Sequence, residues 1–300
     1  MTKKVLILFV ILFIITVCIN ALIAKNDVAA QTYNTMYLPL IINGEGQAQP
    51  DPTPFPTPYP TTQPYVGNKG IALVEPYLED LDSVGATWYY NWSFSCDKLG
   101  EPEYIPMAYT GLVPACMPVD YDGFVLFLNE PNNPAPFGAN IDGVTAGQRY
   151  VEFVTARPKA KLIVGNCSAW STQWYRDFLN EVSKHDVPLP RYYGIHGYIE
   201  AWITTEHLSN YWDGTYYYLR TLSGFTPEVW ITEFSQTTGD TVELDEMLDM
   251  IESKSYITRY AYFTNRYDPT APYIPTGWYD FNLIEDDGSL SPMGLIYAQR

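Results

Sequence analysis

Basic residues are scarce in this sequence: Lys and Arg number 17 against 34 Asp and Glu, and the formal net charge is −17. Such an excess of negative charge repels an extended phosphate backbone rather than binding it. The composition therefore argues against nucleic acid as a partner.

Histidine and cysteine are also rare, with three His and four Cys in 300 residues. The sequence contains no Cys-x-x-Cys pair and no His-Glu-x-x-His motif, which are spacings typical of metal or redox sites. We therefore expect neither a bound metal nor another cofactor.

The amino terminus has the pattern of an export signal. Lys3 and Lys4 precede an apolar run from Val5 to about Ala24, and cleavage after Ala30 fits the small residues there. The run is nearly long enough to span a bilayer, so an uncleaved anchor is the alternative and would be the only membrane contact. We interpret residues 1–30 as a signal peptide or signal anchor, and the protein as secreted or associated with the cell surface.

Residues 31–66 do not have the composition of a folded domain. A short apolar segment, Met36–Ile42, has no assignable role, and residues 45–66 then include proline at alternate positions from Pro50 to Pro60. Alternating proline removes backbone donors and favours an extended polyproline II rod. We interpret this stretch as a semi-rigid spacer that holds the following domain away from a membrane or wall.

Export would place the cysteines in an oxidising compartment. Cys96 and Cys116 bracket a loop-rich stretch, and a disulfide between them would close a loop of about 20 residues, worth about 3 kcal/mol of stability. Cys167 ends an apolar run, where a buried hydrophobic role is expected rather than that of a nucleophile.

Residues 67–300 alternate short apolar runs with longer amphipathic segments, as repeated β-α units do. The runs expected to be strands are Gly70–Val74, Ala86–Trp92, Tyr104–Tyr109, Phe124–Glu130, Lys161–Gly165, Tyr192–His196, Val229–Phe234 and Ile257–Phe263. Helices are expected at about 76–84, 144–156, 170–184, 204–222, 240–254 and 291–299. Eight such units in about 230 residues predict an α/β fold, a compact (β/α)8 TIM barrel.

Two local features refine this prediction. The connections after the second and third strands are too short and too rich in Pro and Gly for full helices, so reduced outer helices are expected there. The helix near 170–184 has Ser168 or Ser171 available as its N-cap.

Two of the expected strands deliver a carboxylate at their ends, Glu130 on the fourth and Glu233 on the seventh. The carboxyl ends of all barrel strands face one side, so these two side chains project into one site. Glycoside hydrolysis uses two carboxylates: a separation of about 5 to 5.5 Å predicts retention and about 6.5 to 9.5 Å predicts inversion. Either glutamate alone would more often form a surface salt bridge or a helix cap, but the pair favours catalysis.

Polar side chains near these strand ends are candidates for substrate binding. Asn129 is placed to hydrogen-bond a sugar hydroxyl, or alternatively to satisfy backbone groups of its loop. His196 and Tyr198 are two residues apart on the sixth strand and share one face, from which they would orient Glu233.

Aromatic residues make up 16% of the sequence, and they serve either as core filling or as platforms for sugar rings. On the second strand, Trp88, Tyr90 and Trp92 alternate with Tyr89 and Asn91, and only one of these two sets faces the site. Two tryptophans in the loops after the sixth and eighth strands would either stack on sugar or pack, and they are Trp202 and Trp278.

Several short motifs occur in a characteristic order along the chain. They are Trp88–Trp92, Ile105–Met107, Leu128–Asn132, His196–Tyr198, Trp230–Phe234 and Asp287–Leu290, the last followed by Gly294 and Tyr297. At these residues the chain resembles the clan A glycoside hydrolases, and more closely glycoside hydrolase family 128, whose small barrels cleave β-1,3-glucan. The resemblance covers about residues 69–300 and implies that Glu130 is the acid/base and Glu233 the nucleophile.

The resemblance has departures along the expected substrate site. Gly197 stands where the family often has an aromatic residue, Ala108 and Tyr109 replace a larger apolar residue and Trp, and Ser93 replaces a glycine. These differences bear on the substrate and its binding mode more than on the reaction type.

Together these features predict an exported, monomeric, retaining glycoside hydrolase. It would cleave β-1,3-glucan by double displacement at bonds within the polysaccharide. Its partner would be a β-glucan polysaccharide or oligosaccharide. The alternatives are another clan A glycanase acting on β-1,4-glucan or mannan, and a surface glycan-binding protein without turnover. The intact glutamate pair argues against the second alternative.

Overall fold

The computed structural model describes residues 68–74, 77–99, 101, 104–168, 171–200, 202–266, 278 and 280–300. The expected export segment at 1–30 and the spacer at 31–66 lie outside the described residues. None of the helices in the described part is long and apolar enough to cross a membrane.

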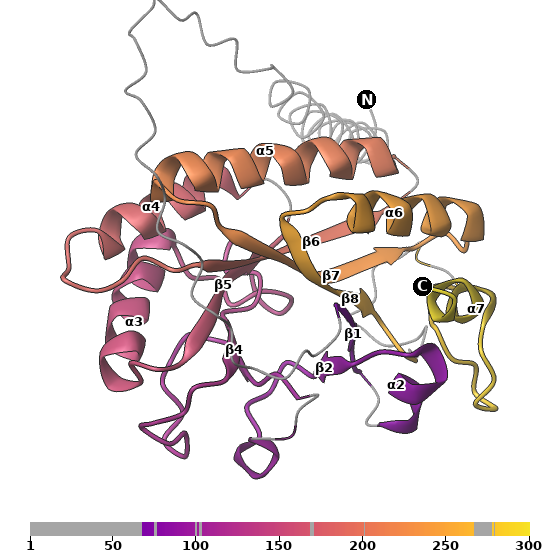
Figure 1. Cartoon of the computed structure of the whole chain (residues 1–300), viewed down its shortest axis with the longest axis horizontal. Helices are drawn as coiled ribbons and strands as arrows, with labels where there is room; N and C mark the ends of the chain where they lie inside the picture. Colours follow the sequence, from indigo (N-terminus) through magenta and orange to yellow (C-terminus); the bar gives the residue numbers. More distant parts are fainter. Residues whose placement is uncertain are drawn as a thin grey trace, which may run out of the picture. The chain divides into compact units, whose positions relative to one another are not determined.

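Eight parallel strands form the centre of the molecule (Figure 1). They are β1 (Lys69–Ala72), β2 (Trp88–Tyr90), β3 (Met107–Ala108), β4 (Phe124–Phe127), β5 (Lys161–Cys167), β6 (Tyr192–Ile199), β7 (Glu228–Gln236) and β8 (Ile257–Phe263). Their order in the sheet is β2-β1-β8-β7-β6-β5-β4-β3. A parallel bridge between Tyr89 and Tyr104 spans the remaining gap between the second and third strands. The sheet is therefore a nearly closed barrel, and the predicted (β/α)8 fold is confirmed.

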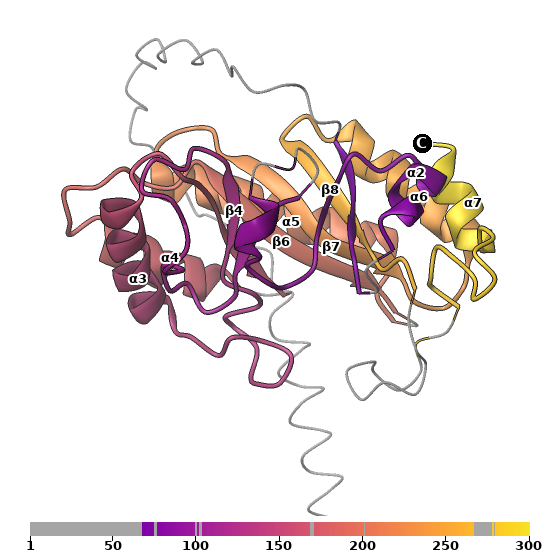
Figure 2. The ribbon, with the colours of Figure 1, turned by 90° about the horizontal axis from the view of Figure 1, so that it is seen from below.

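Helices cover the outside of this barrel. They are α2 (Glu79–Val84), α3 (Gly143–Ala156), α4 (Thr172–Val182), α5 (Thr205–Ser223), α6 (Thr241–Ser253) and α7 (Pro292–Ala298). Helices α5 and α6 run side by side in Figure 1, while α3 lies beside α4 and α7 beside α2 and α6 in Figure 2. Among the described residues, the connections after β2 and β3 hold only the 3-10 turn η1 (Cys96–Lys98) in place of helices, as expected.

The period-two alternation of strand side chains separates an inner core from an outer one. The inner core of the barrel includes Trp88, Leu126, Ile163 and Trp230. Neighbouring residues such as Val125 point outward and pack against the helices. Because the barrel is filled by its own side chains, chemistry is confined to the strand ends.

Two details differ from expectation. Strand β4 ends at Phe127 rather than Glu130, because Leu128 and Glu130 adopt left-handed backbone conformations with φ of 73° and 39°. Ser171 is the N-cap residue of α4, but its side chain makes no capping hydrogen bond; its hydroxyl lies 3.3 Å from the Tyr211 hydroxyl instead.

Candidate active site

Glu130 lies in a tight turn just beyond β4. Its backbone N–H donates to the Asn166 carbonyl at 2.9 Å, which holds the turn against β5. The side chain is 11% exposed, and its Oε2 accepts a hydrogen bond from the Asn133 amide at 2.7 Å. The turn therefore directs a largely buried carboxyl group away from the strand that precedes it.

Glu233 lies inside β7, and the pairing of β7 with β6 is irregular just before it. The side chain is 6% exposed. Its Oε1 accepts hydrogen bonds from the Tyr90 hydroxyl at 2.8 Å and the Trp92 indole N–H at 2.9 Å. Its Oε2 accepts a hydrogen bond from the Tyr198 hydroxyl. These donors stabilise the ionised carboxylate in a site that excludes most water.

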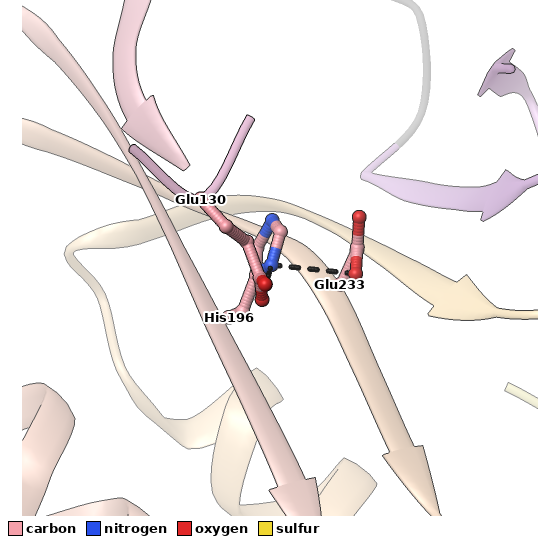
Figure 3. Close-up of side chains that lie close together, drawn as sticks. All are labelled: Glu130, His196 and Glu233. Carbon is pink, nitrogen blue, oxygen red and sulfur yellow. Dashed lines mark hydrogen bonds and ion pairs between the residues drawn. The ribbon is translucent and has the colours of Figure 1, made fainter. Parts of the chain in front are cut away.

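His196 lies between the two glutamates (Figure 3). Its Nδ1 is 2.9 Å from Oε1 of Glu130 and 3.3 Å from Oε2 of Glu233, and the ring is 1% exposed. One oxygen of each glutamate and a nitrogen of His196 all lie within 4.8 Å of one another. The structure thus brings together the two glutamates and the histidine that the strand ends predicted.

The two glutamates influence the ionisation of His196, and His196 and Glu130 influence that of Glu233. Burial opposes the charged imidazolium, but the negative charge of Glu233 and the hydrogen bond to Glu130 outweigh it, so the pKa of His196 lies above its ordinary value. Burial raises the pKa of the Glu233 carboxyl; the charge on His196 opposes that rise and the charge on Glu130 adds to it. Burial and the charge of Glu233 also raise the pKa of Tyr90 and Tyr198 well above the usual range, so both remain neutral donors.

Glu130, His196 and Glu233 are also close enough to share a cation. The Tyr90 hydroxyl, the Trp92 indole and the Tyr198 hydroxyl, however, already direct hydrogen atoms at Glu233. Donor hydrogens occupy the positions where a metal ion would accept lone pairs. The donor set favours a carboxylate that reacts over one that ligates a metal.

The second strand presents one of its two expected faces to the site. Tyr90 and Trp92 contact Glu233, whereas Tyr89 belongs to the outer core. Asn91 is half-buried and accepts a hydrogen bond from the Ser93 hydroxyl at 2.7 Å, and among the described residues no hydrogen bond joins it to either glutamate.

Trp88 is fully buried in the barrel. Its ring packs on Trp230 with centroids 5.3 Å apart, and its indole N–H donates to the Asn68 carbonyl at 3.2 Å. A fully buried ring has no open face for a sugar. The expectation that Trp88 binds substrate is therefore corrected to a packing role.

Asn129 and the two loop tryptophans differ in exposure. The Asn129 amide donates to the Phe137 carbonyl at 3.1 Å, and its buried Oδ1 has no hydrogen-bond partner in the described part of the chain. Trp278 is half-buried, with its ring 4.7 Å from that of Tyr198, while Trp202 is 60% exposed. Asn129 thus serves its loop and also keeps an acceptor, and Trp278 lies beside a donor to Glu233.

The sequence prediction missed three polar residues at the site. Asn133 donates to Glu130, while Asn166 and Thr232 are hydrogen-bonded to each other beneath the two glutamates. An asparagine directly after a glycine within an apolar strand was the available signal for Asn166. The direction in which Asn133 points depends on the turn at Glu130, which the sequence does not reveal.

A family model described as the glycosyl hydrolase catalytic core matches residues 74–297. The match covers most of the barrel and more than half of the chain. The chain belongs to the glycosyl hydrolase catalytic core family. This membership confirms the expectation of a glycoside hydrolase.

One relative is alkali-sensitive linkage protein 1 of Schizosaccharomyces pombe, which is 27% identical to this glycosyl hydrolase core over 255 residues. The alignment covers 77% of this chain and 44% of the relative, so the chain spans less than half the length of the curated relative it matches.

Several solved structures share the barrel. A subgroup II endo-β-1,3-glucanase of glycoside hydrolase family 128 from Sorangium cellulosum is 23% identical with a TM-score of 0.55, covering 77% of this chain and 97% of that one. A subgroup I endo-β-1,3-glucanase from Amycolatopsis mediterranei, in complex with laminaritriose, is 19% identical with a TM-score of 0.57, covering 77% and 98%. A subgroup III curdlan-specific exo-β-1,3-glucanase from Blastomyces gilchristii is 20% identical with a TM-score of 0.56, covering 78% and 98%. The predicted resemblance to family 128 is thus confirmed at the level of the fold.

Proposed function

We propose that this protein is an exported, retaining glycoside hydrolase that cleaves β-1,3-glucan within the polymer by double displacement. The observation that carries the proposal is the pair of buried carboxylates, Glu130 and Glu233, with an oxygen of each within 4.8 Å of the other. This spacing supports retention, because inverting enzymes keep their carboxyl groups about 6.5 to 9.5 Å apart to admit a water.

The hydrogen bonds support different roles for the two glutamates. Within the described part, Glu233 lies within reach of four donors, namely Tyr90, Trp92, Tyr198 and His196. Glu130 has two, Asn133 and His196. Each donor stabilises the ionised form, so Glu233 is the group expected to be charged before the reaction. We therefore assign Glu233 as the nucleophile and Glu130 as the acid/base.

In the first step, Glu233 would attack the anomeric carbon while Glu130 gives its proton to the departing glycosidic oxygen. The bond from carbon to the leaving sugar breaks as the bond to Glu233 forms. In the second step, Glu130 would take a proton from water while the water oxygen bonds to the anomeric carbon, which breaks the bond from that carbon to Glu233 and releases the sugar. His196 stays beside Glu130 throughout, where its N–H would stabilise the charge that appears when Glu130 loses its proton.

The substrate assignment draws on the chain's similarity to β-1,3-glucanases, one of them in complex with laminaritriose. Trp278 and Asn129, whose buried Oδ1 has no hydrogen-bond partner among the described residues, are the residues proposed to contact the sugar beside the scissile bond. Export rests on residues 1–30 alone. Action from the chain end is the second candidate, because one of the similar structures is described as an exo-β-1,3-glucanase.

The test uses a panel of β-1,3-glucan, β-1,4-glucan and mannan with the purified protein. We expect reducing sugar from β-1,3-glucan and a first product with the β-anomeric configuration by NMR. Glu130→Gln and Glu233→Gln should each lower kcat by about 10²- to 10⁴-fold, because each removes a group that transfers a proton or bonds to carbon. A mixture of oligosaccharides early in the reaction supports endo action, and a single short product supports exo action.

Glu228→Gln is the matched control for this test. Glu228 begins the same strand as Glu233 but pairs with Arg191 at the opposite end of the barrel, so its loss should leave kcat unchanged. Full activity in either catalytic variant, or an α-anomeric first product, contradicts the proposed mechanism. Hydrolysis of β-1,4-glucan or mannan alone assigns the protein to another glycanase activity.

A further inference from the structure

Strands β5 and β7 each contain a bulge at a polar residue. The pairing of β5 with β6 skips Asn166, and the pairing of β6 with β7 skips Thr232. Asn166 also has a left-handed backbone conformation, with φ of 49°. Bulges redirect side chains and are frequent beside active sites. Of the two bulged strands, β7 carries Glu233, and β5 pairs with β4, the strand that leads to Glu130.

The two bulge residues meet across the strand between them. The Thr232 hydroxyl donates to Oδ1 of Asn166 at 2.9 Å, and both side chains are completely buried. Gly194 on β6 lies under this contact: a Cβ atom there would be 1.9 Å from Oδ1 of Asn166 and 3.1 Å from Oγ1 of Thr232. A glycine is therefore required for the hydrogen bond to cross β6.

Asn166 also holds the turn that carries Glu130. Its side-chain amide donates to the Leu128 carbonyl at 2.9 Å and lies 3.3 Å from the Phe127 carbonyl. Its own backbone carbonyl accepts the N–H of Glu130 at 2.9 Å. Asn166 thus fixes the backbone on both sides of the turn. Through its hydrogen bond to Thr232, it also holds the residue that directly precedes Glu233.

We propose that Asn166 is a positioning residue that sets the separation of Glu130 and Glu233, with Thr232 as its partner on β7. Asn166 acts through the backbone and hydrogen-bonds neither carboxylate. Only a side-chain amide donates to carbonyls on one side and accepts a hydroxyl on the other without adding charge. The inference rests on the proposed function, in which the carboxylate separation decides the chemistry.

Loss of the hydrogen bond between Thr232 and Asn166 should affect proton donation by Glu130 to the leaving group most. A displacement of about 1 Å at a catalytic group costs about 10²-fold in rate. Thr232→Val keeps the size of the side chain but removes the donor, so we expect a lower kcat on laminaripentaose with KM little changed. A dinitrophenyl β-laminaribioside should be less affected, because dinitrophenolate leaves without a proton from Glu130.

Three variants accompany Thr232→Val in this kinetic test. Thr232→Ser restores the hydroxyl and should recover most of the lost kcat, and Asn166→Ala should reproduce the Thr232→Val pattern. Thr237→Val is the matched control: it also removes a buried threonine donor, to the Ile199 carbonyl at 2.8 Å, but that bond does not connect the glutamates. Equal losses on both substrates, or equal losses in Thr232→Val and Thr237→Val, would show a purely structural role and overturn the proposal.

A second measurement requires no turnover. The two carboxylates raise the pKa of His196, so separating them should lower the midpoint of the His196 titration followed by NMR in Thr232→Val. An unchanged midpoint refutes the positioning role even if Asn166→Ala fails to fold. If the wild type cleaves no glycan in the panel, the proposed function fails, and the His196 titration still decides this inference.

Discussion

At the scale of single residues, Glu130 and Glu233 have the same side chain but differ in the hydrogen-bond donors around their carboxylates. Tyr90, Trp92 and Tyr198 all direct hydrogens at Glu233, whereas Asn133 does so at Glu130. Hydrogen bonds to a carboxylate favour its charged form, and burial opposes it. The competition between burial and these donors sets the pH at which Glu233 becomes a nucleophile.

Tyr198→Phe tests this competition. It removes a hydroxyl that favours the ionised carboxylate, so the pKa of Glu233, which burial already raises, should rise further. Activity is present above the pKa of Glu233 and is lost as pH falls through it, so the acidic limb of kcat/KM should move to higher pH. A hydrogen bond to a charged group is worth about 1.5 to 3 kcal/mol, which corresponds to about 1 pH unit or more.

The pH dependence of kcat/KM is measured for wild type and variant across the acidic range. Tyr150→Phe is the control, since its hydroxyl donates to the Pro188 carbonyl at 3.0 Å in the outer core. A shift of the acidic limb toward lower pH, or the same shift in both variants, would contradict the assignment of Tyr198 as a donor to Glu233.

Sequence reasoning found the residues whose position follows from strand geometry. Glu130 lies just beyond β4, and His196, Tyr198 and Glu233 lie in the carboxyl-terminal halves of β6 and β7, where polar residues interrupt or follow an apolar run. It missed Asn166, because that side chain reaches its partners only through a bulge and a left-handed backbone. Irregular backbone of this kind is a tertiary feature that leaves little trace in a single sequence.

At the scale of helices and strands, the bounds of regular elements were predicted better than those of elements near the site. Strand β8 has the expected bounds, and α3 starts one residue before the expected start. Strand β4 is shorter than predicted because the turn at Glu130 begins earlier, and β5 is longer because its bulge resembles a strand end. Both of these deviations, at β4 and β5, occur where the chain leaves ideal geometry beside the turn that carries Glu130.

Helix α3 provides a prediction at this scale. Asp142 is its N-cap, with Oδ1 accepting the Thr145 N–H at 2.9 Å and Oδ2 accepting the Thr145 hydroxyl at 2.7 Å. Asp142→Ala should lower the free energy of unfolding by about 1 kcal/mol. Asp142→Asn should keep most of the stabilisation that the N-cap contributes. Urea unfolding at neutral pH measures the difference, and kcat should be unchanged in both variants.

The effect of Asp142 should depend on pH in a defined direction. The Thr145 N–H lowers the pKa of Asp142, so the folded pKa lies below the unfolded one. The contribution is complete above the unfolded pKa and is lost as pH falls through the folded pKa. The difference in free energy of unfolding between the wild type and Asp142→Ala should therefore become smaller in acid. A difference that grows in acid would contradict the capping role.

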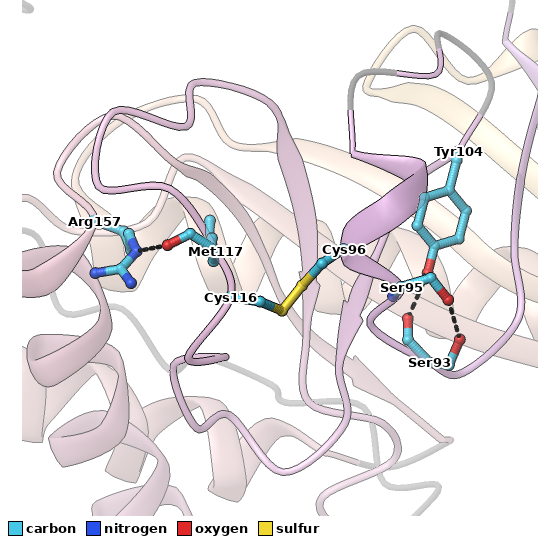
Figure 4. The surroundings of a disulfide bond; sticks show 7 residues. All are labelled: Ser93, Ser95, Cys96, Tyr104, Cys116, Met117 and Arg157. Atoms are coloured by element: carbon cyan, nitrogen blue, oxygen red, sulfur yellow. Dashed lines mark hydrogen bonds between the residues drawn. A yellow bond between two sulfur atoms is a disulfide. The ribbon is translucent and has the colours of Figure 1, made fainter.

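At the scale of the whole barrel, closure is weakest between β2 and β3. These strands have three and two residues, and the described residues contain a single bridge between them, Tyr89 with Tyr104. A disulfide between Cys96 and Cys116, the pair expected from the sequence, ties the connection after β2 to the connection after β3, with Cα atoms 6.1 Å apart (Figure 4). The crosslink thus reinforces the part of the barrel that lacks outer helices.

Both ends of this disulfide are also held by hydrogen bonds. Near Cys96, the Tyr104 hydroxyl donates to the Ser93 carbonyl at 2.9 Å and accepts the Ser95 N–H at 3.1 Å (Figure 4). Next to Cys116, the Met117 carbonyl accepts the Nε–H of Arg157, the C-cap residue of α3, at 2.9 Å. The crosslink therefore connects β2 to α3 across the opening of the barrel.

Replacing both cysteines by serine should lower the free energy of unfolding by about 3 kcal/mol, because a closed loop of about 20 residues restricts the unfolded chain by that amount. Urea unfolding measures the loss of stability. The rate of backbone amide hydrogen exchange should increase first between residues 93 and 117. Trp92 lies just before this stretch and donates to Glu233, so activity should also be lost at a lower temperature than in the wild type. Adding reductant to the double variant should change nothing, whereas adding it to the wild type should reproduce the loss. Equal stability of the wild type and the double variant would mean that the bridge and the hydrogen bonds at Tyr104 and Arg157 close the barrel without the disulfide.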